Sequence, residues 1–218
     1  MYEVRQLIGG QWTADGTGGE LTVLNPADGR PVSRVPIATE SEVAAAVKAA
    51  RATAPVWART APAVRAAAVH RAADEIEAAA ERLATAQTAE MGRPVGGSRA
   101  GVDAGVATLR QYAELGPVHR GRTLAGETGA IDLMVRQPRG VVAAITPWND
   151  PVAVSCGLIG AALVTGNAVV YKPSERAPAT GWLLAQLLAE QLPEGTLSMV
   201  TGDGSVGAAL AAQEVDVV

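Results

Sequence analysis

Residues 140–175, GVVAAITPWNDPVAVSCGLIGAALVTGNAVVYKPSE, decide the fold of this chain. Residues 140–145 are a short apolar run rich in β-branched side chains, which is typical of a strand buried on both faces. Residues 151–164 are apolar and Ala/Gly-rich, are too long for a strand, and end before Gly166 and Asn167 as a helix should. Residues 168–171 predict a second buried strand. Because parallel strands need a crossover connection, this order predicts a βαβ unit.

Polar side chains follow both strands, at the point where each strand ends. They are Thr146, Trp148, Asn149 and Asp150 after the first strand, and Lys172, Ser174 and Glu175 after the second. Ligands bind at the carboxyl ends of the strands in open parallel sheets. The unit is therefore predicted to gather an amide, a cation and a carboxylate on one rim of the sheet.

The composition of the 218 residues, with 48% hydrophobic and 18% charged side chains, is that of a soluble globular protein. A net charge of −4 does not favour binding to nucleic acid or to an anionic membrane surface. Residues 1–11 do not resemble a secretory signal, and no apolar run reaches the ~18 residues of a membrane span. Cys156 is the only cysteine, which excludes an internal disulfide and predicts a cytoplasmic location.

The rest of the chain extends the α/β pattern in both directions. Residues 2–37 are predicted to form short strands and turns, with a hairpin at Gly9-Gly10. A capping box, Thr39-x-x-Glu42, opens a helix to about residue 51. Helices follow over 62–91, broken once, and over 98–115. After residue 175 we expect a helix over 178–192, a strand over 196–200, a helix over 205–212 and a strand from 215. The fold class is thus α/β, a Rossmann-like parallel sheet with flanking helices and an N-terminal helical and strand segment.

Residues 121–139 differ in character from their surroundings. Residues 122–127 and 130–137 are predicted to be two extended segments joined near Thr128-Gly129. They form either a projecting arm or an ordinary edge hairpin, and an edge strand in either case invites pairing with another chain. The apolar run at Val215–Val218 further suggests that the chain is the N-terminal portion of a longer molecule.

Five motifs resemble the aldehyde dehydrogenase superfamily in order and spacing: PWN at 147–149, KPSE at 172–175, Asn25-Pro26, EMGRPV at 90–95 and VTGDG at 200–204. The resemblance covers the N-terminal half of a family member. It implies the N-terminal part of a cofactor-binding domain over 1–120, a β-ribbon oligomerisation arm over 121–139, and Rossmann-like NAD-binding βα units over 140–218. The catalytic domain would lie downstream.

The resemblance also implies an activity, oxidation of an aldehyde to a carboxylic acid with NAD(P)⁺. In the family a catalytic cysteine forms a thiohemiacetal, hydride passes to the nicotinamide, and a glutamate activates water. No residue of this sequence matches that cysteine or that glutamate, so the chain alone is expected to be inactive. The expected partners are an aldehyde and further copies of the chain, joined through residues 121–139.

The family assigns the catalytic role here to Asn149, whose side-chain N–H would stabilise the oxyanion formed at the substrate carbonyl. The alternative is an asparagine that satisfies the turn or caps the next helix. The position of Lys172 in the second turn suits pairing with the ribose hydroxyls or with a phosphate of the cofactor. Glu175 would accept both hydroxyls of the adenosine ribose, and a carboxylate there would repel a 2′-phosphate. NAD is therefore expected as the cofactor and NADP less so. The alternative is a solvated ion pair on a loop.

Four residues are expected to line the cofactor groove: Ile145, Thr146, Pro147 and Trp148. Trp148 could equally be a core aromatic residue. Gly204 lies in a Gly-x-Gly-x-x-Gly turn that packs against the adenine in this family, so it is a further candidate for cofactor binding.

The remaining candidates are predicted to be structural. Cys156 is expected to be a buried thiol in the middle of a helix. Asp150 stands where the family usually has an apolar residue, and we expect it to cap the helix that begins at Pro151. Two histidines and one cysteine do not provide a metal-binding constellation.

A different class of function fits the same sequence. The chain could be a non-catalytic nucleotide-binding or oligomerising module, or one part of a split enzyme.

Overall fold

The computed structural model describes residues 1–14 and 18–218, so residues 15–17 of the predicted strand-and-turn segment lie outside the described residues. The strands are β1 (Tyr2–Glu3), β2 (Gln6–Ile8), β3 (Gln11–Thr13), β4 (Glu20–Leu24), β5 (Pro31–Pro36), β6 (Arg122–Leu124), β7 (Asp132–Met134), β8 (Val141–Ile145), β9 (Ala168–Lys172) and β10 (Leu197–Met199). The helices are α1 (Glu40–Arg59), α2 (Pro62–Ala78), α3 (Ala80–Met91), α4 (Val95–Leu115), α5 (Pro151–Val164), α6 (Pro178–Ala189) and α7 (Gly204–Ala211), with a 3₁₀ turn at Gly116–Val118.

The main sheet has the strand order β3-β2-β10-β9-β8. β8, β9 and β10 are parallel, as the βαβ pattern predicts, whereas β2 joins β10 in antiparallel fashion. β2 and β3 form the predicted hairpin, in which Gly9 and Gly10 both have positive φ. Beyond β8, Val217 forms a parallel bridge with Val142, so the predicted terminal strand does begin alongside this sheet.

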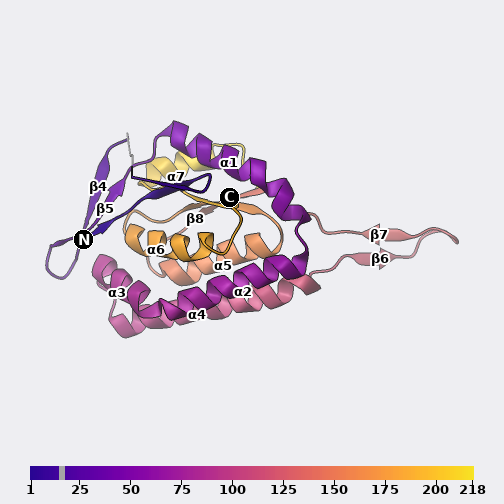
Figure 1. The fold of residues 1–218 in the computed structure, drawn as a ribbon, viewed down its shortest axis with the longest axis horizontal. Coiled ribbons are helices and arrows are strands. Elements are labelled where there is room, and N and C mark those ends of the chain that lie inside the picture. The colour runs from indigo at the N-terminus through magenta and orange to yellow at the C-terminus, as the bar shows by residue number, and fades with distance from the viewer. Residues whose placement is uncertain (15–17) are drawn as a thin grey trace.

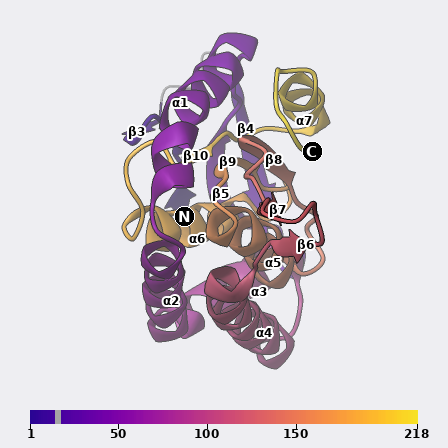
Figure 2. The ribbon, with the colours of Figure 1, turned by 90° about the vertical axis from the view of Figure 1, so that its right-hand side faces the viewer.

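Helices cover both faces of the main sheet (Figure 1). Figure 2 shows α1 and α7 on one face, α5 and α6 on the other, and α2, α3 and α4 in a further layer beyond them. β9 is buried throughout because its side chains alternate between two cores. Ala168 and Val170 pack with α1 and α7, while Val169 and Tyr171 pack with α5 and α6. This confirms the prediction of a second buried strand over residues 168–171. β8, for which burial on both faces is predicted, is buried at Val141, Ala143 and Ala144 but exposed at Ile145.

The arm stands apart from the body of the molecule. Within the described residues, β6 and β7 pair only with each other as an antiparallel ribbon, and the ribbon projects from the end of the helical layers (Figure 1). All six residues of the two strands are exposed. Of the two alternatives left open by the sequence, the structure therefore has the projecting arm. A second small sheet, with order β1-β5-β4, lies near the opposite end.

Several boundaries differ from the sequence prediction. The capping box at Thr39 and Glu42 is present, but α1 continues to Arg59 through Pro55 instead of ending near residue 51. Burial of Trp57, whose Nε1 donates to the carbonyl of Leu163 at 3.0 Å, holds this last turn in place. The stretch 62–91 is broken once, at Ala79, as predicted, and α4 begins three residues early, at Val95.

The proposed division at 1–120, 121–139 and 140–218 stays a prediction. Strand β2 of the first segment pairs with β10 of the third, so the two segments share one sheet. Within the described part of the chain, no helix combines the length and apolar character that crossing a membrane requires.

Candidate functional site

The two turns that carry the predicted site begin side by side. β8 and β9 are in register with Ile145 opposite Lys172, and the amide of Thr146 donates to the carbonyl of Lys172 at 3.1 Å. The chain therefore leaves both strands at the same edge of the sheet, as expected for the carboxyl ends of parallel strands. Thr146 is buried, whereas Pro147, Trp148 and Asn149 are exposed after it.

Lys172 and Glu175 are brought together within the second turn. Nζ of Lys172 lies 3.7 Å from Oε2 of Glu175, and Ser174 Oγ donates to the same carboxylate oxygen at 3.3 Å. Lys172 is only 3% exposed, so a solvated pair on a loop does not describe it. Burial lowers the pKa of Lys172 from its ordinary value, and the nearby carboxylates of Glu175 and Asp203 act in the opposite direction. The turn thus holds a largely desolvated ammonium beside a half-exposed carboxylate.

Trp148 is not a core aromatic residue. It is 45% exposed, and the guanidinium carbon of Arg176 lies 5.4 Å from the centroid of its ring. A cation above an aromatic face at this distance makes a favourable cation–π contact. The contact also joins the two turns, because Trp148 follows β8 and Arg176 follows β9.

Asn149 has a side chain that makes no hydrogen bond to any other residue in the described part of the chain, while its backbone carbonyl accepts from Arg93 at 3.4 Å. Helix α5 has no side-chain cap, so Asn149 does not serve the capping role that the sequence left open. Its amide is exposed at the rim of the sheet and available to a ligand. The predicted role in stabilising an oxyanion stays a prediction.

The expectation that Asp150 caps α5 with its side chain is wrong. Asp150 occupies the N-cap position without a capping hydrogen bond, and its Oδ1 instead lies 3.1 Å from Nη1 of Arg93. Oδ1 is shielded from solvent and, among the described residues, makes no hydrogen bond of good geometry. The contact with Arg93 is therefore an ion pair without a hydrogen bond.

A buried polar network supports the turns from below. Ser155 Oγ of α5 lies 3.0 Å from Tyr171 Oη of β9 and donates to Thr146 Oγ1 at 3.3 Å. Burial raises the pKa of Tyr171 to about 12, so the phenol stays protonated and acts as a hydrogen-bonding group. The network ties the start of the first turn to the crossover helix and to the neighbouring strand.

Glu90 is a residue that the sequence reasoning missed, although it begins the EMGRPV motif. Its buried carboxylate accepts from the amides of Ala179 and Thr180 at 2.8 and 2.9 Å, from Thr180 Oγ1 at 2.8 Å and from Ser33 Oγ at 3.0 Å. Burial raises its pKa, against the opposing effect of these donors. The signal was available: α6 follows Ala177, which cannot cap it, so the free amides of α6 required an acceptor from elsewhere.

The first turn of α7 packs onto the same edge of the sheet. Asp203 caps this helix by accepting from the amide of Ser205 at 2.9 Å. A Cβ on Gly207 would lie 3.8 Å from Cδ of Lys172 and 3.9 Å from Cγ2 of Ile145. Gly204 is exposed, and a Cβ there would meet nothing within 4 Å. Glycine at 207 lets α7 approach Lys172 and Ile145 closely, and glycine at 204 leaves the start of the helix open.

Cys156 is fully buried, which confirms the prediction of a buried thiol. Burial raises its pKa to about 12, so at neutral pH it is a thiol and a poor nucleophile. Among the described residues, no group of three or more potential metal ligands lies together. An apolar cavity of about 760 Å³ lies along the outer side of β8, lined by residues that include Val142, Leu158 and Val217. Of the predicted site residues, Ile145 alone contributes to its lining.

The fold and the site define a class: an α/β protein with polar groups at the carboxyl ends of adjacent parallel strands, the arrangement used to bind nucleotides. Residues 12–218 match the aldehyde dehydrogenase family. The chain is 34% identical to the NADP/NAD-dependent aldehyde dehydrogenase PuuC of Escherichia coli (strain K12), over 93% of this chain and 42% of that protein. It therefore spans about two fifths of the length of this curated relative.

Solved structures agree with this assignment. AldA of P. syringae, an indole-3-acetaldehyde dehydrogenase solved with NAD⁺, superimposes with a TM-score of 0.94 at 37% identity, over 98% of this chain and 44% of that one. The NADP-dependent glyceraldehyde-3-phosphate dehydrogenase of Bacillus halodurans C-125, solved with NADP, superimposes with a TM-score of 0.94 at 30% identity. The match covers 98% of this chain and 47% of that one. The chain belongs to the aldehyde dehydrogenase family and corresponds to an N-terminal portion of its members.

Proposed function

We propose that this chain is the cofactor-binding portion of an NAD-dependent aldehyde dehydrogenase that oxidises an aldehyde to a carboxylic acid. The observation that carries the proposal is the meeting of two turns at one edge of the sheet. The buried Lys172 pairs with Glu175 in one turn, and the exposed Trp148 and Asn149 lie in the other. Family relatives that work with NAD or NADP support a dinucleotide as the ligand.

The residues present fit the adenosine half of such a cofactor. The ammonium of Lys172 and the carboxylate of Glu175, 3.7 Å apart, supply a donor and an acceptor for the two ribose hydroxyls. The open surface at Gly204 suits a flat base. The side of the proposed cofactor site between that surface and Asn149 consists of four residues: Ile145, Thr146, Pro147 and Trp148. When bound, NAD⁺ supplies the hydride acceptor.

NAD is proposed over NADP because Glu175 keeps a half-exposed carboxylate at the ribose position. A 2′-phosphate placed there would face like charge, which is destabilising. Replacing Glu175 with Gln should therefore narrow the difference in affinity between the two dinucleotides. A difference that is unchanged in this variant would contradict the proposed basis of the preference.

For Asn149 we propose that the side-chain N–H donates to the carbonyl oxygen of the aldehyde as negative charge develops on it. A fixed donor of this kind contributes about 3 kcal/mol to transition-state stabilisation. The exposed amide without an internal hydrogen bond supports this role, because it needs no rearrangement to receive a ligand. The only cysteine, Cys156, is buried and protonated, so the chain by itself should turn over no aldehyde.

Isothermal titration of the purified chain with NAD⁺ tests the proposal. The sequence has two lysines, which allows a matched comparison. Lys172→Ala should weaken NAD⁺ binding at least about tenfold, since it removes a desolvated charge that contacts the ligand. Lys48→Ala, on the exposed face of α1, should leave binding unchanged. Absence of NAD⁺ binding in the unaltered chain would refute the proposal.

We further propose that the β6–β7 arm joins copies of the chain into a homo-oligomer. The arm exposes an apolar set that the body of the molecule does not cover: Leu124, Ile131, Leu133, Met134 and Val135. Both outer strand edges are unpaired within the described chain, and such edges accept a further strand. Light scattering should give a mass above that of one chain, and Leu133→Lys should lower it. A monomer at every concentration would exclude this role.

The free thiol of Cys156 and the dinucleotide chemistry support a cytoplasmic location as part of the same proposal. A second candidate function is one part of a split enzyme. The apolar cavity beside β8 favours it, because a partner chain could cover that surface.

A further inference from the structure

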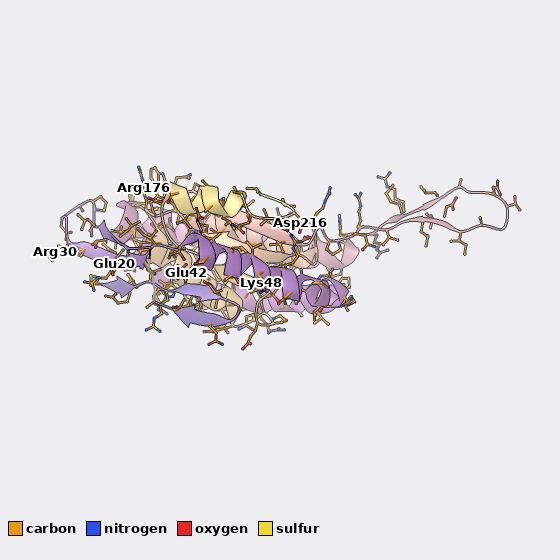
Figure 3. The ribbon with its side chains drawn as sticks, turned by 90° about the horizontal axis from the view of Figure 1, so that it is seen from above. Glu20, Arg30, Glu42, Lys48, Arg176 and Asp216 are labelled. Atoms are coloured by element: carbon orange, nitrogen blue, oxygen red, sulfur yellow. The ribbon has the colours of Figure 1, made fainter. Side chains whose placement is uncertain are left out.

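Arg176 was absent from the sequence-based candidates, yet its side chain crosses the site. Its backbone amide donates to Ser174 Oγ at 3.3 Å, which fixes the turn directly after Glu175. From there the guanidinium extends to the ring of Trp148, 5.4 Å from the centroid. Figure 3 shows Arg176 on the side of the molecule away from the arm, near α7. The side chain thus lies between the two turns.

The other charges at this edge do not sum to a site for an anion. The ammonium of Lys172 is opposed by Glu175 at 3.7 Å and by the nearby carboxylate of Asp203, which leaves an excess of one negative charge. A dinucleotide carries two further negative charges on its pyrophosphate. Arg176 is exposed and makes no ion pair with any carboxylate in the described part of the chain. It is therefore a cation free to meet an incoming anion.

The order of groups along the edge indicates which part of the ligand meets Arg176. A dinucleotide runs from adenine through ribose and pyrophosphate to the second ribose and the nicotinamide. The site runs from the open glycine surface of α7, through the pair of Lys172 and Glu175, to Asn149. The span between that pair and Asn149 holds Trp148 with Arg176 stacked on it. This is the span that the pyrophosphate would occupy.

We infer that Arg176 binds the pyrophosphate of the dinucleotide, with the ring of Trp148 holding the guanidinium in place before the ligand arrives. The inference rests on the proposed function. Arg suits this role because its planar group donates in pairs to phosphate oxygens and also stacks on aromatic faces. Pre-positioning on Trp148 reduces the side-chain entropy lost when the ligand binds.

Calorimetric titration of the whole 218-residue chain with NAD⁺, NADP⁺, ADP-ribose and adenosine tests the inference. Arg176→Ala should weaken binding of NAD⁺ and ADP-ribose about tenfold or more and leave adenosine unaffected, since adenosine has no phosphate. Arg176→Lys should retain part of the affinity because it keeps the charge. The salt dependence of NAD⁺ binding should weaken in Arg176→Ala. Arg82→Ala, an exposed arginine on α3 without an ion pair in the described chain, is the matched control.

Each other outcome overturns the inference in a recognisable way. If Arg176→Ala binds NAD⁺ with the same affinity as the unaltered chain, Arg176 does not bind the pyrophosphate. Equal losses for adenosine and ADP-ribose show an effect on the adenosine end. A loss confined to NADP shows that Arg176 contacts the 2′-phosphate instead. If the unaltered chain binds no dinucleotide, the proposed function fails and the inference fails with it, whereas binding in the unaltered chain isolates any failure to Arg176.

Discussion

The edge of the sheet that carries the site and the β6–β7 arm lie at different parts of the molecule (Figure 1). Both present apolar side chains to solvent. The turns after β8 and β9 are anchored by buried groups: the hydroxyl network of Thr146, Ser155 and Tyr171, and the carboxylate of Glu90 below α6. In the part of the chain that the structure describes, the strands of the arm pair only with each other, and all their residues are exposed. The difference indicates that the site is preorganised by the core, whereas the arm gains buried contacts only from a partner.

Glu90 provides the strongest test of that anchoring. Glu90→Gln replaces one carboxylate oxygen with an NH₂ group. That NH₂ group would face N–H and O–H groups that now donate hydrogen bonds to the carboxylate. Each carboxylate oxygen accepts two hydrogen bonds, which means that neither orientation of the amide avoids the conflict. We expect a loss of about 3 kcal/mol in the free energy of unfolding, measured by urea denaturation.

The matched control is Glu114→Gln, an exposed position on α4, where the change should be within about 0.5 kcal/mol. If Glu90→Gln unfolds at the same urea concentration as the unaltered chain, the turn after β9 does not depend on this carboxylate. The contrast between the site and the arm would then lose its main support.

Local patterns were sufficient to predict the elements that make the site. The apolar runs of residues 140–145 and 168–171, separated by a helix, match β8, α5 and β9 within one residue, because strand and helix patterns there agree with burial. The capping box at Thr39 was equally local. The turn residues Lys172 and Glu175 are three apart in sequence, so their pairing could also be expected.

The contacts that join distant segments could not be predicted in this way. Glu90 and Thr180 are 90 residues apart, and Arg93 and Asp150 meet only because α4 packs beside α5. Asp150 therefore occupies the N-cap position that the local pattern predicts, but its side chain pairs with Arg93 and does not cap the helix. Trp148 has no neighbour in sequence that indicates whether it is buried, and only the stacking of Arg176 on its ring defines its surroundings.

Gly181 tests how closely α6 approaches the turn after β9. A Cβ at this position would lie 2.4 Å from Cβ of Pro173 and 2.9 Å from Oη of Tyr171. The proline ring is rigid and belongs to the KPSE turn, so Gly181→Ala should cost about 2 kcal/mol in the free energy of unfolding. Gly157→Ala, in α5 with nothing within 4 Å, should instead stabilise slightly because alanine favours helix. Equal effects at the two glycines would show that the packing is looser than the structure indicates.

Lys172 should make stability depend on pH in a direction that its burial sets. Its pKa in the folded chain is lowered from 10.5, so the unfolded chain binds more protons in the window between the lowered value and 10.5. The free energy of unfolding of the unaltered chain, measured relative to that of Lys172→Met, should therefore increase as the pH rises through that window. The increase should be at most about 1.4 kcal/mol per pH unit. Lys48→Met, at an exposed site on α1, is the matched control. If the free energy of unfolding relative to Lys172→Met instead decreases as the pH rises, the result would contradict the burial of Lys172.

The arm should give the smallest effect on the fold itself. Leu133→Ser removes an apolar side chain that is 59% exposed on β7, so at a concentration where the chain is monomeric the free energy of unfolding should change by less than about 0.5 kcal/mol. The same substitution at Leu183, buried in α6, should cost several times more. At higher concentration Leu133→Ser should weaken association, because the exposed leucine then becomes an interface residue. If Leu133→Ser instead lowers the stability of the monomer by more than about 1 kcal/mol and leaves association unchanged, the arm is packed against its own chain, and the contrast with the site edge is wrong.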